Sequence, residues 1–82
     1  MASYVLMADW RESMTGCEAT EIRPPAAMSA QAARAQAAAW AGTLAKDGFD
    51  RIVVRIETAD GAQLDWCVVD GDGNPVWQNV GV

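Results

Sequence analysis

The sequence predicts an α+β fold in which a five-stranded antiparallel sheet carries one helix on one face. Three observations predict it: an alanine-rich run with helical periodicity, alternating apolar and polar segments on both sides of that run, and glycine-rich turn signals between the segments. The chain has 82 residues, of which 51% are hydrophobic and four are Trp. We therefore expect a single small α+β domain over residues 1–82, in the order ββαβββ.

An N-terminal hairpin comes first. Residues 3–11, SYVLMADWR, alternate as a strand does, and residues 15–24 supply its partner after a turn over residues 12–16. The Pro24-Pro25 pair then ends this part of the sheet, because proline cannot donate a ladder hydrogen bond.

The helix is expected over Ala30 to Asp47. Ser29 is a good N-cap, and Gly48 is a natural residue to follow the C-terminus. At about 100° per residue, one stripe of side chains faces the sheet and the opposite side faces solvent. The expected buried stripe is Ala33, Ala37, Trp40 and Leu44. The far side is expected to carry Gln31, Arg34 and Lys46.

Three strands complete the predicted sheet. Residues 49–58 alternate with an apolar face, and Asp60-Gly61 is a strong hairpin signal before residues 64–69. The segment GDGNP then turns the chain into residues 76–80. The apolar face of the first of these strands is Ile52, Val54 and Ile56. In the next strand, Leu64, Trp66 and Val68 share one face, and Asp65, Cys67 and Val69 share the other.

One helix covers only one side of such a sheet, so the other side is expected to be an association surface. The residues assigned to that self-association surface are Val53, Cys67, Val69 and Trp77. An exposed Cys67 near a two-fold axis would then be able to cross-link two copies under oxidation. The alternative is that these side chains lie at sheet edges or under the N-terminal hairpin.

The segment VVDGDGNPVW resembles the start of a calcium loop, with Asp70, Asp72 and Asn74 at alternate positions. A helix-flanked calcium loop needs glycine at its sixth position and a bidentate Glu at its twelfth. Here those positions are Pro75 and Gly81, and the flanking residues favour strands. We therefore interpret the segment as a hairpin turn and expect no metal and no cofactor. The minor alternative is a weak surface calcium site.

Composition argues against catalysis. The chain has no His, one Lys and two Cys without metal-ligand spacing, so the usual general base, nucleophile activators and zinc ligands are missing. The net charge of −5 disfavours direct binding to nucleic acid, whereas an acidic surface can occupy a basic channel on another protein. The simpler interpretation is that the negative charge keeps the protein soluble. No apolar run has the length of about 20 residues that a membrane span needs, and the first residues lack a signal-peptide pattern. We therefore expect a cytoplasmic protein.

Several short motifs resemble a known family. They are Tyr4-Val5-Leu6, Gln31-Ala32-Ala33-Arg34, Phe49, Arg55-Ile56-Glu57-Thr58, Asp60-Gly61, Asp72-Gly73 and Trp77. Together they look like a small phage-encoded anti-CRISPR protein of type I-F systems, and the likeness runs through most of the chain. The resemblance implies an inhibitor that binds the backbone subunits of Cascade, the RNA-guided surveillance complex, and blocks hybridisation of target DNA.

The resemblance also implies a contact surface. In that family the polar helix face and the helix C-terminal end make much of the contact. Arg34 is retained, whereas Ala33 stands in place of a lysine and Asp47 in place of a glutamine. The acidic loops are expected to contribute by meeting a basic DNA path. The expected partner-binding residues are Gln31, Arg34, Lys46, Asp47, Asp60, Asp70 and Asp72.

Three other classes compete with this hypothesis. The alternative of most weight is a phage or bacterial assembly protein that dimerises through its open sheet face. An antitoxin-like module is disfavoured because the chain has no separate basic DNA-binding segment, and an enzyme is disfavoured for the reasons of composition given above.

Overall fold

The computed structural model describes residues 2–78, and it has one helix and six strands in that range. The elements are β1 (Ser3–Glu12), β2 (Glu18–Ile22), β3 (Ala26–Ala27), α1 (Ala30–Lys46), β4 (Phe49–Thr58), β5 (Gln63–Val69) and β6 (Pro75–Trp77). The predicted α+β class and single helix are therefore confirmed, and the predicted order ββαβββ is confirmed apart from the additional strand β3. The part of the predicted last strand that covers residues 79 and 80 lies outside the described residues.

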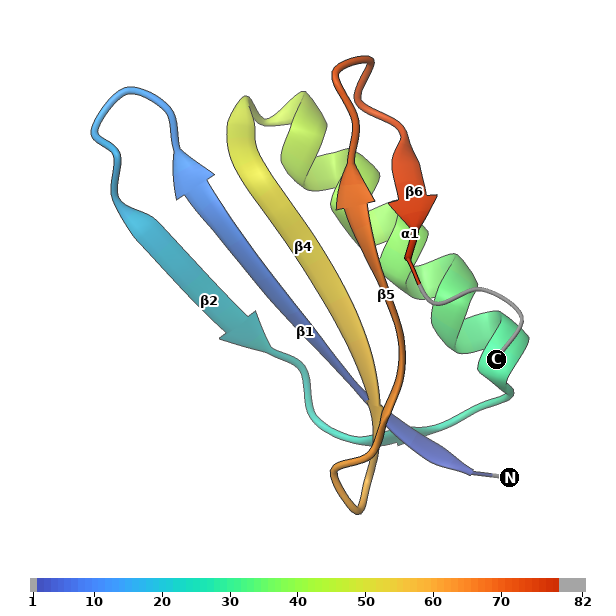
Figure 1. Ribbon diagram of the computed structural model, residues 1–82. Helices are drawn as coiled ribbons and strands as arrows, with labels where there is room; N and C mark the ends of the chain where they lie inside the picture. Colours follow the sequence, from blue (N-terminus) through green and yellow to red (C-terminus); the bar gives the residue numbers. More distant parts are fainter. Residues whose placement is uncertain (1, 79–82) are drawn as a thin grey trace.

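The sheet is antiparallel throughout, in the spatial order β2-β1-β4-β5-β6 (Figure 1). The two-residue strand β3 was not expected. It pairs with the start of β1 and continues the β2 edge after Pro24-Pro25 interrupts it. Proline removes a ladder donor at that edge, which accounts for the interruption.

The helix begins and ends where the sequence indicates. The Ser29 hydroxyl accepts a hydrogen bond from the N–H of Ala32, and Gly48 takes the positive φ of 88° that a residue after the helix often needs. In Figure 1 the helix lies behind the sheet, against β4, β5 and β1. Its buried residues are Ala33, Ala37, Trp40, Ala41 and Leu44. No helix in residues 2–78 is long and apolar enough to cross a membrane.

The core lies between this helix and one face of the sheet. Small alanines let α1 approach closely, while Trp40 and Leu44 fill the space beside them. The sheet contributes alternate residues of the three central strands. They are Tyr4, Leu6 and Ala8 from β1, Ile52, Val54 and Ile56 from β4, and Asp65 and Cys67 from β5.

The predicted facing of β5 is wrong. Cys67 is paired with Val54 and is fully buried under the helix, so it does not lie on the uncovered face. Val69 and Trp77 pack against the same core, and of the four predicted self-association residues, Val53 alone lies on the uncovered side. Each face of β5 carries apolar residues, so hydrophobicity alone did not show which face would turn toward the helix.

A buried ion pair explains the orientation that β5 takes. Asp65 is fully buried, and its Oδ2 accepts a hydrogen bond of 3.0 Å from Nε of Arg34 on the helix. Its Oδ1 accepts a bond of 2.8 Å from the N–H of Trp66. A buried carboxylate needs such partners, because unpaired charge in the interior is costly. Arg34 thus lies at the helix–sheet boundary, and its predicted place on the far side of the helix is wrong.

We predict that Arg34→Met lowers the free energy of unfolding by about 2 kcal/mol, because it leaves the Asp65 charge buried without its cation. The effect is expected below that of a fully enclosed pair, since about a third of the Arg34 side chain is exposed. Urea denaturation measures it. The exposed Lys46→Met serves as control and is expected to change the free energy of unfolding by less than about 0.5 kcal/mol. Equal effects of the two substitutions would contradict a stabilising role of the pair.

We also predict that the two thiols differ in reactivity. Cys17 is exposed, whereas burial raises the pKa of the fully buried Cys67 to about 11. An aromatic disulfide reagent at pH 8 should therefore modify one thiol per native chain, and both in denaturant. The native Cys17→Ser variant should not react. Rapid modification of Cys67 in that variant would contradict the burial of Cys67 under the helix.

Candidate functional site

One end of the molecule gathers charged side chains from four elements. Here β1 ends beside the start of β4, with Glu12 opposite Phe49, and α1 ends just before β4 (Figure 1, top). The β5–β6 turn lies at the same end, because Asp70 and Ala45 line one hollow there. We call this region the acidic end and define it by Glu12, Glu18, Asp47, Asp50, Asp70 and Asp72, together with Arg11, Lys46 and Arg51. Six carboxylates and three cations give it three of the chain's five net negative charges.

An ion pair between β1 and β4 fixes this end. Arg11 donates two hydrogen bonds of 2.9 Å to Asp50, from Nε to Oδ1 and from Nη2 to Oδ2. Both side chains are partly exposed. The bonds from Arg11 lower the pKa of Asp50, and Arg51 lowers it further through its charge. The bidentate geometry holds the two strand ends in a defined position.

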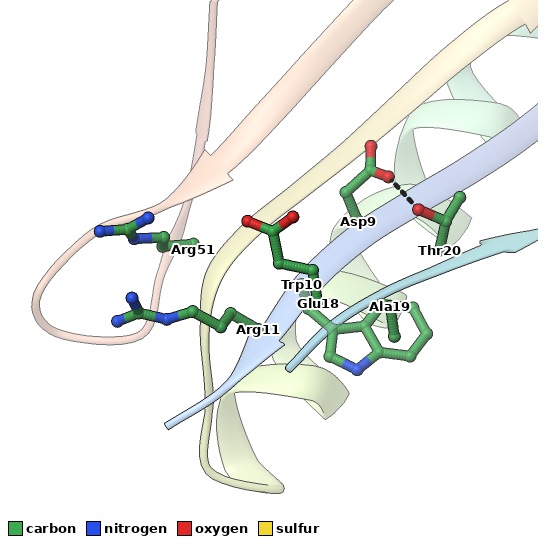
Figure 2. A pocket seen from close by; sticks show the side chains of 7 residues that line it. All are labelled: Asp9, Trp10, Arg11, Glu18, Ala19, Thr20 and Arg51. Carbon is green, nitrogen blue, oxygen red and sulfur yellow. Dashed lines mark hydrogen bonds between the residues drawn. The ribbon is translucent and has the colours of Figure 1, made fainter. Parts of the chain in front are cut away.

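A small charged hollow adjoins this pair on the uncovered side of the sheet. Its volume is about 200 Å³, and Figure 2 shows Arg11 and Arg51 extending in the same direction beside Glu18. Arg51 is the one residue other than glycine with a positive φ, 51°, among those described, and its side chain has no ion pair or hydrogen bond with another described residue. Such a backbone conformation is unusual for a residue that carries a side chain. The lining is Asp9, Trp10, Arg11, Glu18, Ala19, Thr20 and Arg51.

The β1–β2 turn presents an apolar side chain beside these charges. Met14 is 91% exposed at its tip. The turn is held at both sides, by a bond from the N–H of Gly16 to the carbonyl of Glu12 and by one from the Ser13 hydroxyl to the carbonyl of Gly48. Met14 is therefore an exposed apolar group on a turn of fixed position.

The β5–β6 turn is a hairpin connection, as the sequence predicted. Oδ1 of Asp70 accepts hydrogen bonds of 2.9 Å from the N–H groups of Asp72 and Asn74, and Gly73 takes a φ of 83°. The carboxylate of Asp70 thus builds the turn, whereas Asp72 is exposed to solvent. Within residues 2–78 no group of three or more His, Cys, Asp or Glu side chains could hold a metal ion.

The predicted partner-binding residues do not form one surface. Lys46, Asp47, Asp70 and Asp72 belong to the acidic end, Gln31 and Asp60 lie at the opposite end, and Arg34 is engaged by Asp65. Asp60 accepts a hydrogen bond from the Thr58 hydroxyl in the β4–β5 turn, which lowers its pKa. The structure therefore separates two acidic turns that are only ten residues apart in the sequence.

The uncovered side of the sheet is a second candidate surface, which we call the open face. It is defined by Val5, Met7, Asp9, Ile22, Val53, Arg55, Glu57, Trp66, Val68 and Val76. Ile22 is 62% exposed and Val76 is 41% exposed, and the other members are partly buried by their neighbours. No other described element covers this face, because α1 packs on the opposite side.

Sequence reasoning missed the residues that give the acidic end its form. Arg11 and Asp50 are far apart in the sequence, and nothing local marks them as partners. Arg51 has an ordinary strand context, so its positive φ has no sequence signal. Met14 stands between turn residues, which was a usable signal, because an apolar residue at the tip of a predicted hairpin has no core to enter.

Comparison of the chain with models of known protein families, with curated proteins and with solved structures finds no match.

We predict that Arg11→Met raises the pKa of Asp50 toward its ordinary value of 3.8, because it removes the two bonds to the charged carboxylate. The folded-state pKa lies below the unfolded-state value, so this pair stabilises the fold above about pH 4 and the contribution is lost as pH falls through the folded pKa. A carboxyl-detected NMR titration measures the shift. Arg55→Met, which removes the partner of Asp9 instead, should leave the Asp50 pKa in place. An unchanged Asp50 titration in Arg11→Met would refute the pairing.

Proposed function

We propose that this chain is a non-catalytic inhibitor that binds a type I Cascade surveillance complex through its acidic end and blocks target DNA from entering. The observation that carries the proposal is the acidic end itself, which combines carboxylates without an ion-pair partner among the described residues with the exposed Met14 of the β1–β2 turn. Of its six carboxylates, Asp50 alone forms an ion pair within the described residues.

The physical argument is one of complementary potential. A surface that binds nucleic acid offers rows of Lys and Arg, and free carboxylates at matching positions are attracted to it as phosphates are. Glu12, Asp47 and Asp72 are exposed, and their side chains have no partner within residues 2–78, so they can approach such a surface without first breaking a bond of their own. Met14 supplies an apolar anchor at the same end of the molecule.

Rigidity supports occlusion as the mechanism. The acidic end is built on the ends of three paired strands and a helix terminus, and both of its turns are closed by internal hydrogen bonds. A preformed surface loses little conformational entropy on binding. Blocking a channel needs shape and charge and no bond chemistry, which agrees with a chain that lacks histidine.

The class of partner comes from the resemblance to the type I-F anti-CRISPR family, which the motifs around Arg34, Arg55 and Trp77 carry. The structure changes which surface is proposed to dock. The family's helix-face arginine corresponds to Arg34, which is held by Asp65 here, so we assign contact to the acidic end. On this proposal the protein is phage-encoded and acts in the cytoplasm of a bacterial host.

A second candidate is an assembly protein that works through the open face. The observation that favours it is the extent of apolar surface left without cover by a single helix.

The test of the proposed function is binding of a target duplex by purified type I Cascade complexes of several subtypes, each with and without excess protein. We predict loss of DNA binding in at least one subtype. In the subtype that is inhibited, the double variant Asp47→Asn/Asp72→Asn should raise the half-inhibitory concentration roughly tenfold at low salt. The increase should be smaller at high salt, because both carboxylates face solvent and their charges are screened.

The matched control carries the same change in charge elsewhere. Glu21→Gln with Asp60→Asn removes two exposed carboxylates away from the acidic end and should leave inhibition within about twofold of the original. Intact DNA binding in every subtype would reject Cascade as the partner. Equal loss in the two double variants would reject the acidic end as the contact surface.

A further inference from the structure

The open face differs from the rest of the surface in charge. The chain carries −5 in total, whereas the open face carries −1, from Asp9, Glu57 and Arg55. Arg55 lies beside Asp9 at an Nη2–Oδ2 distance of 3.3 Å. Apolar side chains surround the pair on five of the six described strands of the sheet. They are Met7 and Val5 on β1, Ile22 on β2, Val53 on β4, Trp66 and Val68 on β5, and Val76 on β6.

Two transverse rows cross the face, as the strand register shows. Met7 lies between Ile22 and Arg55, and Arg55 lies beside Trp66. In the neighbouring row, Asp9 lies beside Val53, which is followed by Val68 and Val76. Each row therefore combines one charged side chain with large apolar ones, and the two charges have opposite sign.

The Arg55 guanidinium is not fully used within one chain. Its bond to Asp9 is its one side-chain hydrogen bond among the described residues, and its Nε is buried without an acceptor. Buried donors are normally satisfied. Its second terminal nitrogen remains available to an acceptor from outside the chain, and a carboxylate is the acceptor best matched to it.

The whole side of the molecule that holds the open face is large enough for a stable complex. The longer dimensions of the molecule are 40 and 23 Å, which outline roughly 900 Å² in projection. A standard interface buries about 800 Å² on each partner. A smaller ligand would leave much of the apolar surface in water.

We propose that the occupant of the open face is a second copy of this chain, packed face to face as a two-fold symmetric dimer. A two-fold axis running between β1 and β4 sets β1 of one copy opposite β4 of the other. Each Arg55 is then near the second copy's Asp9, so these two charges keep an opposite partner as water leaves. Glu57 stands one residue before the end of β4 and so lies toward the end of the contact. The open face carries one of the chain's five net negative charges, so most of the repulsion between two acidic chains arises away from the contact.

The inference does not depend on the proposed function, since the two surfaces use different residues. Cys67 takes no part in it, because this thiol lies under the helix on the other side of the sheet. The dimer is therefore non-covalent, and reducing agents should not change its mass.

The test is sedimentation equilibrium of the full chain from about 1 µM to about 500 µM. The expected result is a shift from one to two times 8.7 kDa within this range. Ile22→Lys with Val68→Lys should raise the dissociation constant at least tenfold, because it places two charges in the apolar surface. The matched control Met14→Lys makes the same kind of change off the face and should leave the constant unchanged. Circular dichroism establishes that each variant is folded.

Three results would overturn the proposal. They are a monomer at every concentration, a dimer whose dissociation constant is the same in the double variant, and a dimer weakened as much by Met14→Lys. The second would point to pairing through the exposed β2 edge, and the third to association through the acidic end. If the double variant does not fold, Val76→Lys replaces it, because Val76 is exposed on the short edge strand β6 and contributes little to the core.

Discussion

The structure depends on one constraint: a single helix can cover only one face of the sheet. The chain meets it with an alanine-rich helix that approaches the sheet closely and places its large side chains, Trp40 and Leu44, where the core is deepest. The apolar side chains that alternate with the core residues along the strands therefore remain at the surface. The same constraint explains why β5 turns Asp65 inward, since the helix brings Arg34 to meet it and Trp66 is left on the open face.

Local signals were sufficient for most of the fold. Ser29 and Gly48 define the ends of the helix, and the alternation of residues 49–58 gives β4 with both of its limits. The hairpin turns follow from glycine and aspartate at positions that need positive φ or a capped backbone N–H. Each of these features is decided within a few residues, which is why sequence alone reaches them.

The features that were missed depend on partners distant in the chain. The facing of β5 is set by an ion pair between Arg34 and Asp65, and the form of the acidic end by one between Arg11 and Asp50. The extra residue Leu64, where the β4–β5 register shifts, also breaks the simple alternation. The candidate site was predicted in part: Asp47 and Asp72 lie on it, whereas Gln31 and Asp60 lie at the other end.

The central claim is that the acidic end, and not the helix face, contacts a nucleic-acid-binding protein. Hydrogen–deuterium exchange of this chain, alone and with a type I Cascade complex in excess, tests it most directly. The account predicts slower exchange over residues 12–18 and 70–74 and at the helix C-terminus, with the β4–β5 turn around Asp60 unchanged. Protection confined to the first turns of the helix or to the β4–β5 turn would contradict it, as would exchange that is the same in both samples.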